Sequence, residues 1–331
     1  MLCGRRATDV ITDLCKDQSE LFISTVSLKD EILLKRILED KVDILIDLCR
    51  HTAQNRLRVL AARAAPVQIT WIGYVSTTGL PCVDYLLEDT TSAPANAPQQ
   101  FTETVLNIEG AYLCYARPAE LPPLKPPPCL VKHHITFGCF GALAKLSDPT
   151  LEMWGQLLAQ IPDSVLFLQR GIYADERVRE VFTERAACCG LNIEQVQFSG
   201  GLPYEAFLKS YSDVDIMLDT VPFSGGSTTA EALWMGVPVV TLAGERFGSR
   251  TSASLLAGAG LNELVAHTPA EYVSLANSLT RDPEQLKRWR THIRAQMMNS
   301  NSGNPRILTS KLDETLSQAW HRWCDEVPAA P

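Results

Sequence analysis

The sequence has no long hydrophobic run. None of its apolar segments approaches the roughly twenty residues that a helix needs to cross a bilayer. The first ten residues, MLCGRRATDV, also lack the apolar core of a secretory signal peptide. We therefore expect no membrane partner and a cytoplasmic location, with the nucleus as an alternative compartment.

Positive charge is scarce as well. The chain has 30 lysine and arginine residues against 38 aspartate and glutamate residues, so its formal net charge is −8. This excess of acidic residues argues against a nucleic acid or an anionic membrane as the main partner. A locally positive pocket remains compatible with it.

Patterns for metal binding and redox chemistry are missing. The ten cysteines include no CxxC pair and no cluster with histidine, which argues against structural zinc and predicts reduced thiols. No Asp-x-Asp signature stands beside the Gly-rich loop described below, so we expect no metal and no other cofactor. The chain also has no tandem repeats.

The pattern that is present is an alternation of strands and helices. Apolar runs typical of buried strands alternate with segments of helical periodicity, which predicts an α/β fold with parallel sheets. A Pro-rich segment, ARPAELPPLKPPPCLV, divides this pattern into two series. We predict two Rossmann-like doubly wound halves that face a cleft, where a ligand would bind. The predicted parts are residues 1–115, a linker at 116–131, residues 132–305, and a closing helix and tail at 306–331.

The most informative segment consists of a short apolar strand, a Gly-rich loop and a helix. Two glycines let the backbone approach a ligand closely, and the hydroxyls that follow stand at the start of a helix that Gly236 ends. Unpaired N–H groups and the positive end of the helix dipole make such a tip an anion site, and we expect a diphosphate there. The alternative is an ordinary turn without a ligand. The candidate ligand-binding residues are Gly225, Gly226, Ser227, Thr228 and Thr229.

Three charged residues extend this candidate site. Lys145 follows an apolar strand and precedes a helix, where its charge could neutralise a phosphate; the alternative is a solvated lysine. Glu231 lies about one turn inside the helix, where a carboxylate could bind a ribose diol or only complement the helix dipole. Arg170 ends another strand and is a further candidate cation.

Other candidates are polar or aromatic residues in turns. Tyr204 and Phe207 stand where a strand turns into a helix, and could stack on a nucleobase or simply pack in the core. His51 follows a strand in the first half and could exchange a proton with a substrate hydroxyl, or serve as a polar cap.

Four segments, in order, carry a resemblance to a known family. They resemble the catalytic region of the O-linked N-acetylglucosamine transferase and SPINDLY family, glycosyltransferase family 41, over nearly the whole chain. The segments are DILIDLCRHTAQNRL, APVQITWIGYVSTTGLPCVDYLLED, FGALAKLSDPTLEMW and DIMLDTVPFSGGSTTAEALWMGVPVVTLAGERFGSR. The resemblance implies a GT-B fold and metal-independent transfer of a sugar from a nucleotide sugar to serine or threonine hydroxyls of intracellular proteins. Family members generally carry tetratricopeptide repeats ahead of this region.

The resemblance also assigns roles by position. Lys145 matches the family lysine that contacts the diphosphate, and Glu231 matches the acidic residue that holds the ribose. Ser227 and Thr228 match the hydroxyls of the phosphate loop. Ile72 and Gly73 fall in the segment that lines the sugar pocket in family members. His51 falls in the family's loop near the acceptor side.

The sequence departs from the family pattern at several positions. Gly141 and Ala142 stand where members usually have Gln or Asn, and Tyr204 and Phe207 replace a lysine and a histidine near the base. The family's opening strand and its His-Pro loop have no counterpart, so the chain resembles a truncated catalytic region with an incomplete N-terminal half.

The predicted function is therefore inverting transfer of N-acetylglucosamine from UDP-GlcNAc to protein serine or threonine hydroxyls. Lys145 and His51 are the predicted catalytic residues, and the expected partners are a nucleotide sugar and an acceptor protein. Two alternatives stay open: a protein O-fucosyltransferase that uses GDP-fucose, and a weakly active or inactive fragment that binds nucleotide sugars. A retaining GT-B enzyme that acts on small sugars fits the fold but not the resemblance.

Overall fold

The computed structural model describes residues 1–3, 9–96 and 101–326. Its contacts divide the chain into two compact units, of which unit 1 comprises Met1–Leu87, Gln100–Leu106 and Glu314–Pro331. Unit 2 comprises Glu88–Gln99 and Asn107–Asp313. The Pro-rich linker predicted at 116–131 thus belongs to unit 2 by its contacts, while the predicted domain limits themselves stay a prediction. The end of the predicted C-terminal tail, 327–331, lies outside the described residues.

The described residues of unit 1 form two sheets. A two-stranded parallel sheet pairs β1 with β2, and a four-stranded sheet has the order β3-β4-β5-β6, in which β3, β4 and β5 run parallel. The helices α2 and α3 share a small buried core that includes Leu33, Ile37 and Val59. The elements before residue 28 were not predicted. The bounds are β1 (Leu2–Cys3), α1 (Val10–Asp17), β2 (Ile23–Ser24), α2 (Asp30–Glu39), β3 (Ile44–Asp47), α3 (Leu57–Ala61), β4 (Val67–Thr70), β5 (Tyr85–Glu88) and β6 (Thr104–Asn107).

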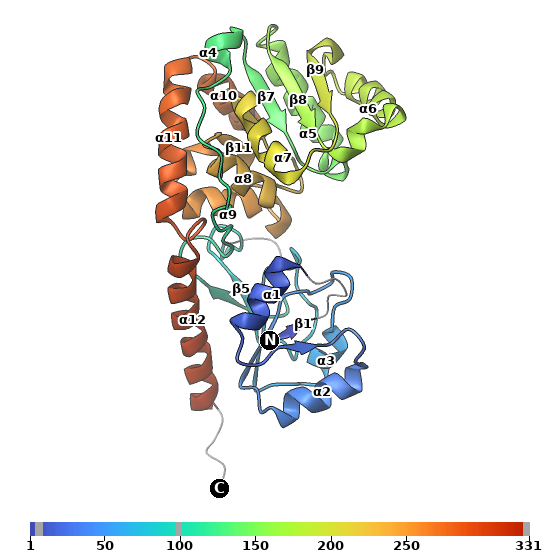
Figure 1. Ribbon diagram of the computed structural model, residues 1–331, viewed down its shortest axis with the longest axis vertical. Helices are drawn as coiled ribbons and strands as arrows, with labels where there is room; N and C mark the ends of the chain where they lie inside the picture. Colours follow the sequence, from blue (N-terminus) through green and yellow to red (C-terminus); the bar gives the residue numbers. More distant parts are fainter. Residues whose placement is uncertain (4–8, 97–100, 327–331) are drawn as a thin grey trace. The chain divides into compact units, whose positions relative to one another are not determined.

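Unit 2 follows the predicted second series of strands and helices (Figure 1). Its helices and strands are α4 (Cys129–Lys132), β7 (Thr136–Cys139), α5 (Asp148–Ala159), β8 (Val165–Gln169), α6 (Glu176–Cys188), β9 (Val196–Ser199), α7 (Tyr204–Ser210), β10 (Ile216–Leu218), α8 (Ser227–Trp234), β11 (Val239–Leu242), α9 (Thr251–Gly258), β12 (Val265–Ala266), α10 (Pro269–Leu279) and α11 (Pro283–Asn299). The closing helix, α12 (Pro305–Glu326), confirms the helix predicted at the C-terminal end.

The sheet of unit 2 has the order β12-β11-β10-β7-β8-β9, and all five neighbouring pairs are parallel. The chain therefore winds outward from β7 in one direction through β8 and β9, and from β10 in the other direction through β11 and β12. In sheets of this kind, ligands bind beyond the carboxyl ends of the two central strands, where the winding reverses. The loops after β7 and β10 meet at this point and carry the predicted phosphate site.

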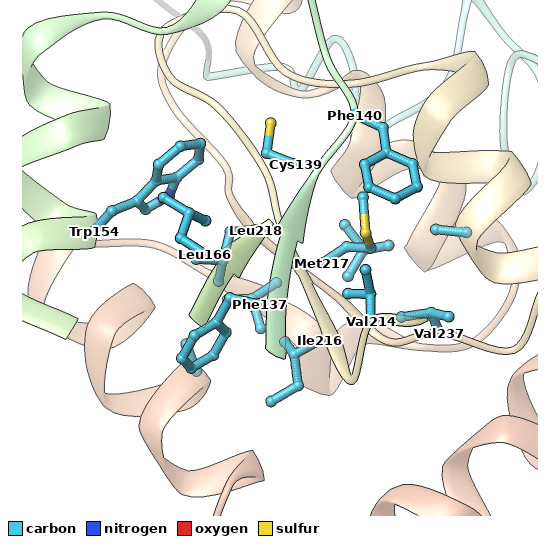
Figure 2. Packing of buried hydrophobic residues seen from close by; sticks show 14 of the residues in the cluster. Phe137, Cys139, Phe140, Trp154, Leu166, Val214, Ile216, Met217, Leu218 and Val237 are labelled. Atoms are coloured by element: carbon cyan, nitrogen blue, oxygen red, sulfur yellow. The ribbon is translucent and has the colours of Figure 1, made fainter. Parts of the chain in front are cut away.

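Both faces of this sheet are covered by apolar side chains, as expected for a parallel sheet. Figure 2 shows the two layers: Phe137, Leu166 and Trp154 lie on one side of β7, and Met217 and Val237 lie on the other. A Cβ atom at Gly138 would lie 2.8 Å from the Val214 side chain, so this position on β7 needs glycine. The carboxyl edge of the sheet is thus held by a tightly packed core.

The Pro-rich connector is fixed along unit 2 by hydrogen bonds. Arg294 of α11 donates to the carbonyl oxygens of Trp234 (2.7 Å) and Pro122 (3.0 Å). Gly236, with φ of +72°, ends α8 in the left-handed conformation that glycine favours, as predicted. In the described parts of the chain, no helix combines the length and the hydropathy needed to span a bilayer.

Candidate functional site

A cavity of about 510 Å³ lies at the carboxyl edge of the sheet in unit 2. Its walls come from the loops after β7, β8, β9 and β10 and from the first turn of α8. Residues that the sequence analysis singled out separately therefore share one cavity. They are Gly141, Ala142, Lys145, Arg170, Tyr204, Phe207, Gly226, Ser227, Thr228 and Glu231.

The tip of α8 forms one wall of this cavity. The helix begins at Ser227, and no side chain among the described residues caps it. Ser227 is exposed and Thr228 is half-buried, and both line the cavity. The uncapped amides of a helix start can bind an anion, because they donate hydrogen bonds and lie at the positive end of the helix dipole.

The loop that leads into α8 is braced from below. Asp219 accepts hydrogen bonds from the Gly225 amide (2.7 Å) and from the Thr241 hydroxyl (2.6 Å). The Thr229 hydroxyl contacts the Ser252 hydroxyl at 2.8 Å, and Thr229 is buried. Gly225 and Thr229 thus support the loop from outside the main cavity, and their predicted contact with the ligand stays a prediction. The site was expected to use both threonines, but only Thr228 faces the cavity.

Lys145 lies directly against the same loop. Its ammonium group donates a hydrogen bond to the Ser224 carbonyl oxygen (2.7 Å) and lies 4.4 Å from the centre of the Phe223 ring. Burial lowers the pKa of Lys145 from its ordinary value of 10.5, because the charged form loses hydration. The carbonyl and the ring hold the ammonium in place, and its other two N–H groups remain to meet an anion at the cavity.

Glu231 is the acidic group of the cavity. It projects from α8 and is 6% exposed. Oε1 accepts a hydrogen bond from the Tyr115 hydroxyl (2.9 Å), and Oε2 accepts one from the Tyr211 hydroxyl (3.2 Å). Burial raises the pKa of Glu231 above its ordinary value, and the two hydroxyl donors oppose this rise by favouring the ionised form.

The two aromatic candidates differ in their surroundings. Phe207 packs against Phe140 and Tyr211, with ring centroids 5.7 Å and 5.4 Å apart. Tyr204 is 52% exposed, and its hydroxyl lies 3.0 Å from that of Tyr115. Phe207 is therefore part of an aromatic cluster that reaches the cavity, whereas Tyr204 presents an exposed ring at its rim.

Two further residues, Gln169 at the cavity and Tyr115 beside Glu231, were not predicted. Gln169 ends β8, lines the cavity and is 1% exposed; its Oε1 contacts the Ser210 hydroxyl (2.5 Å), and its Nε2 has no hydrogen-bond partner among the described residues. Its position at a strand end was a usable signal, the same one that drew attention to Arg170. Tyr115 directly precedes the Pro-rich connector, in a stretch without periodic pattern, so the sequence offered no signal for it.

The remaining predicted residues lie in unit 1. His51 is exposed, and its Nε2 lies 3.1 Å from the Thr77 carbonyl oxygen. Because a carbonyl only accepts hydrogen bonds, Nε2 carries the proton, which leaves Nδ1 as an acceptor in the neutral ring. Ile72 has φ of +57°, and a Cβ atom at Gly73 would lie 2.0 Å from the Leu48 carbonyl oxygen, so this turn requires glycine.

The acidic groups do not form a metal site in the described ranges of the chain: no cluster of three or more histidine, cysteine, aspartate or glutamate residues could hold an ion. The cavity instead combines one ammonium group, one guanidinium group and an uncapped helix tip with a buried carboxylate. The first set attracts phosphate oxygens and the second attracts hydroxyl donors. A ligand that carries both a diphosphate and a diol would satisfy the two sets together.

Comparisons with known proteins find a matching family model and several similar proteins. The sequence model of glycosyl transferase family 41 matches residues 8–117 and 129–312. A barley (Hordeum vulgare) relative named as a probable UDP-N-acetylglucosamine–peptide N-acetylglucosaminyltransferase SPINDLY is 38% identical over 87% of this chain. A relative from Arabidopsis thaliana, named as the probable transferase SEC, is 26% identical over 93% of it. The chain spans about a third of the length of these two relatives, 31% and 32%.

Solved structures give the same result at the level of fold. A mutant of the Thermobaculum terrenum O-GlcNAc transferase superimposes with a TM-score of 0.91 at 32% identity, and the match covers 98% of this chain and 62% of that one. The Anabaena protein HepE, crystallised with UDP and glucose, gives a TM-score of 0.59 at 13% identity and covers 96% of this chain and 91% of its own. The latter likeness shows the fold alone. The predicted GT-B type of α/β fold is confirmed.

Proposed function

The chain belongs to glycosyltransferase family 41, and from this premise we propose that it transfers N-acetylglucosamine from UDP-GlcNAc to serine or threonine hydroxyls of proteins. The proposed reaction inverts the anomeric centre and uses no metal ion or other cofactor. The observation that carries the proposal is that Lys145 and the uncapped tip of α8 line the same cavity as Glu231. We also propose that it acts in the cytoplasm or nucleus, where acceptor proteins are available.

In this proposal, unit 2 binds the donor. The amides and hydroxyls at Ser227 and Thr228 and the ammonium of Lys145 bind the diphosphate, and Glu231 accepts hydrogen bonds from the ribose. The base lies toward Tyr204 and Phe207 at the rim. As the bond between the sugar and the diphosphate breaks, negative charge grows on the leaving oxygen. Fixed donors stabilise this charge without the need for a divalent ion.

Unit 1 contributes the acceptor side in the same proposal. The acceptor hydroxyl attacks the anomeric carbon on the face opposite the diphosphate, and its proton passes to a base. With Nε2 donating to the Thr77 carbonyl oxygen, Nδ1 of His51 is an acceptor, which makes His51 the candidate base of the described chain. Ile72 and Gly73 belong to the neighbouring turn that the resemblance assigns to the sugar pocket.

Binding and transfer are tested in two steps. Calorimetric titrations with UDP and with GDP show which nucleotide the cavity prefers, and incubation with UDP-GlcNAc or GDP-fucose and serine- or threonine-containing peptides is read by mass spectrometry. Preference for UDP and a peptide mass increased by one N-acetylhexosamine support the proposal. Preference for GDP with transfer of fucose supports the fucosyltransferase alternative, and binding without any transfer supports a binding module. Absence of binding to both nucleotides contradicts the proposal.

A further inference from the structure

Tyr115 holds one oxygen of the Glu231 carboxylate inside the cavity. Its hydroxyl is 2.9 Å from Glu231 Oε1, and the hydroxyl of Tyr211 is 3.2 Å from Oε2. The Tyr211 hydroxyl also lies 3.1 Å from the Thr228 carbonyl oxygen and belongs to a fully buried ring. Each carboxylate oxygen of Glu231 therefore accepts a hydrogen bond from a different tyrosine.

The backbone of Tyr115 is fixed on both sides. Its amide donates to the Ser302 carbonyl oxygen (2.9 Å), and its carbonyl oxygen accepts from the Trp234 indole N–H (2.8 Å). Trp234 lies three residues after Glu231 on α8, so the helix that carries the carboxylate also anchors the tyrosine that holds it. This arrangement places the Tyr115 hydroxyl with little freedom to move.

The Glu231 carboxylate can accept more hydrogen bonds than the two tyrosines donate. An ionised carboxylate has about four lone-pair sites, two on each oxygen. The tyrosines occupy one on each oxygen, which leaves one on each oxygen for other donors. A vicinal diol carries two hydroxyl donors at a spacing that suits two oxygens of one carboxylate. The two remaining sites thus fit the 2′ and 3′ hydroxyls of a ribose.

We propose that Tyr115 is a positioning residue of the ribose subsite, which orients Glu231 so that the cavity selects ribonucleotides over 2′-deoxyribonucleotides. This inference rests on the proposed binding of a nucleoside diphosphate. Tyr115 acts through Glu231 and not by contact with the reacting atoms. Tyr204 supplies the matched control, because its hydroxyl contacts Tyr115 (3.0 Å) and lies in the same cavity without a hydrogen bond to Glu231.

The test compares the affinities of UDP and 2′-deoxy-UDP by calorimetry, with GDP and 2′-deoxy-GDP as a second pair. In the wild-type protein, 2′-deoxy-UDP lacks one hydrogen bond to a charged acceptor, so the ratio of the UDP affinity to the 2′-deoxy-UDP affinity is expected to be roughly ten. Tyr115→Phe removes only the hydroxyl and is expected to reduce this ratio to about threefold or less, because Glu231 loses its orientation. Tyr204→Phe is expected to keep the ratio within about twofold of the wild-type value.

Two further measurements make the result specific. Pyrophosphate, which has no ribose, is expected to bind Tyr115→Phe as it binds the wild type, and this shows that the cavity is intact. Glu231→Gln is expected to lower the ratio as Tyr115→Phe does, and the double variant should lower it no further, since both changes act on one carboxylate.

The outcomes separate this inference from the function on which it rests. If the wild type binds neither UDP nor GDP, the proposed function fails and the inference fails with it. If the wild type binds a nucleotide but Tyr115→Phe keeps or increases the ratio, the inference alone is overturned. An equal decrease of the ratio in Tyr115→Phe and Tyr204→Phe would also overturn the inference, since the decrease would then not depend on the hydrogen bond from Tyr115 to Glu231.

Discussion

Replacement of Lys145 by methionine separates the charge of this residue from its bulk. The hydrogen bond from Nζ to the Ser224 carbonyl oxygen (2.7 Å) and the contact with the Phe223 ring (4.4 Å) are lost, but so is the cost of holding an ammonium in a half-buried position. These effects oppose each other, so we expect the free energy of unfolding to change by about 1 kcal/mol or less. A charge-assisted hydrogen bond to a diphosphate is worth about 1.5–3 kcal/mol, and its loss should weaken UDP binding roughly 10- to 150-fold.

The assay is calorimetric titration of the wild type and of Lys145→Met with UDP and with uridine. Uridine has no phosphate, so its affinity is expected to stay within about twofold of the wild-type value. Urea unfolding of both proteins provides the stability control. An unchanged UDP affinity, or an equal loss of affinity for uridine, would show that Lys145 does not neutralise phosphate charge.

Two further predictions concern pH and the two threonines. Burial lowers the pKa of Lys145, so its amine is charged below that pKa and loses its charge as the pH rises through it. The UDP affinity of the wild type should therefore fall at a pH below the ordinary lysine pKa of 10.5. Calorimetric titrations in alkaline buffers should show no such fall for Lys145→Met. Thr228 faces the cavity while the Thr229 hydroxyl contacts Ser252, so Thr228→Val should weaken UDP binding about fivefold with little loss of stability, and Thr229→Val should lower the free energy of unfolding by about 1 kcal/mol with little loss of affinity. The opposite pattern in calorimetry and urea unfolding would show that the second hydroxyl binds the ligand.

Much of unit 2 could be predicted because its sequence is locally consistent. The apolar run at 215–218 predicts a strand, the glycines after it predict a turn, and Gly236 predicts a helix end. The structure has β10, the loop and the end of α8 in these places. The same pattern brought Lys145 and the tip of α8 to one sheet edge, since carboxyl ends of parallel strands share an edge. Local periodicity and turn chemistry therefore sufficed for this part of the site.

The features that escaped prediction depend on contacts between distant residues. Tyr115 reaches Glu231 from 116 residues away, and nothing in the sequence around Tyr115 signals this contact. The Thr229 hydroxyl turns toward Ser252 because of how α8 packs on α9, and the sequence alone gave both threonines the same role. The limits of the compact units also depend on tertiary contacts, which assign the connector to unit 2 in spite of its linker-like composition.

The proposed function depends above all on binding of the diphosphate by the tip of α8. The most direct measurement records the backbone amide resonances of Ser227 and Thr228 in deuterated, ¹⁵N-labelled protein during titration with UDP and with uridine. If the claim holds, UDP shifts these two amides strongly and uridine leaves them nearly unchanged, because hydrogen bonds from the helix start need a phosphate acceptor. UDP that binds without shifting either amide would show that the diphosphate does not lie at the tip of α8.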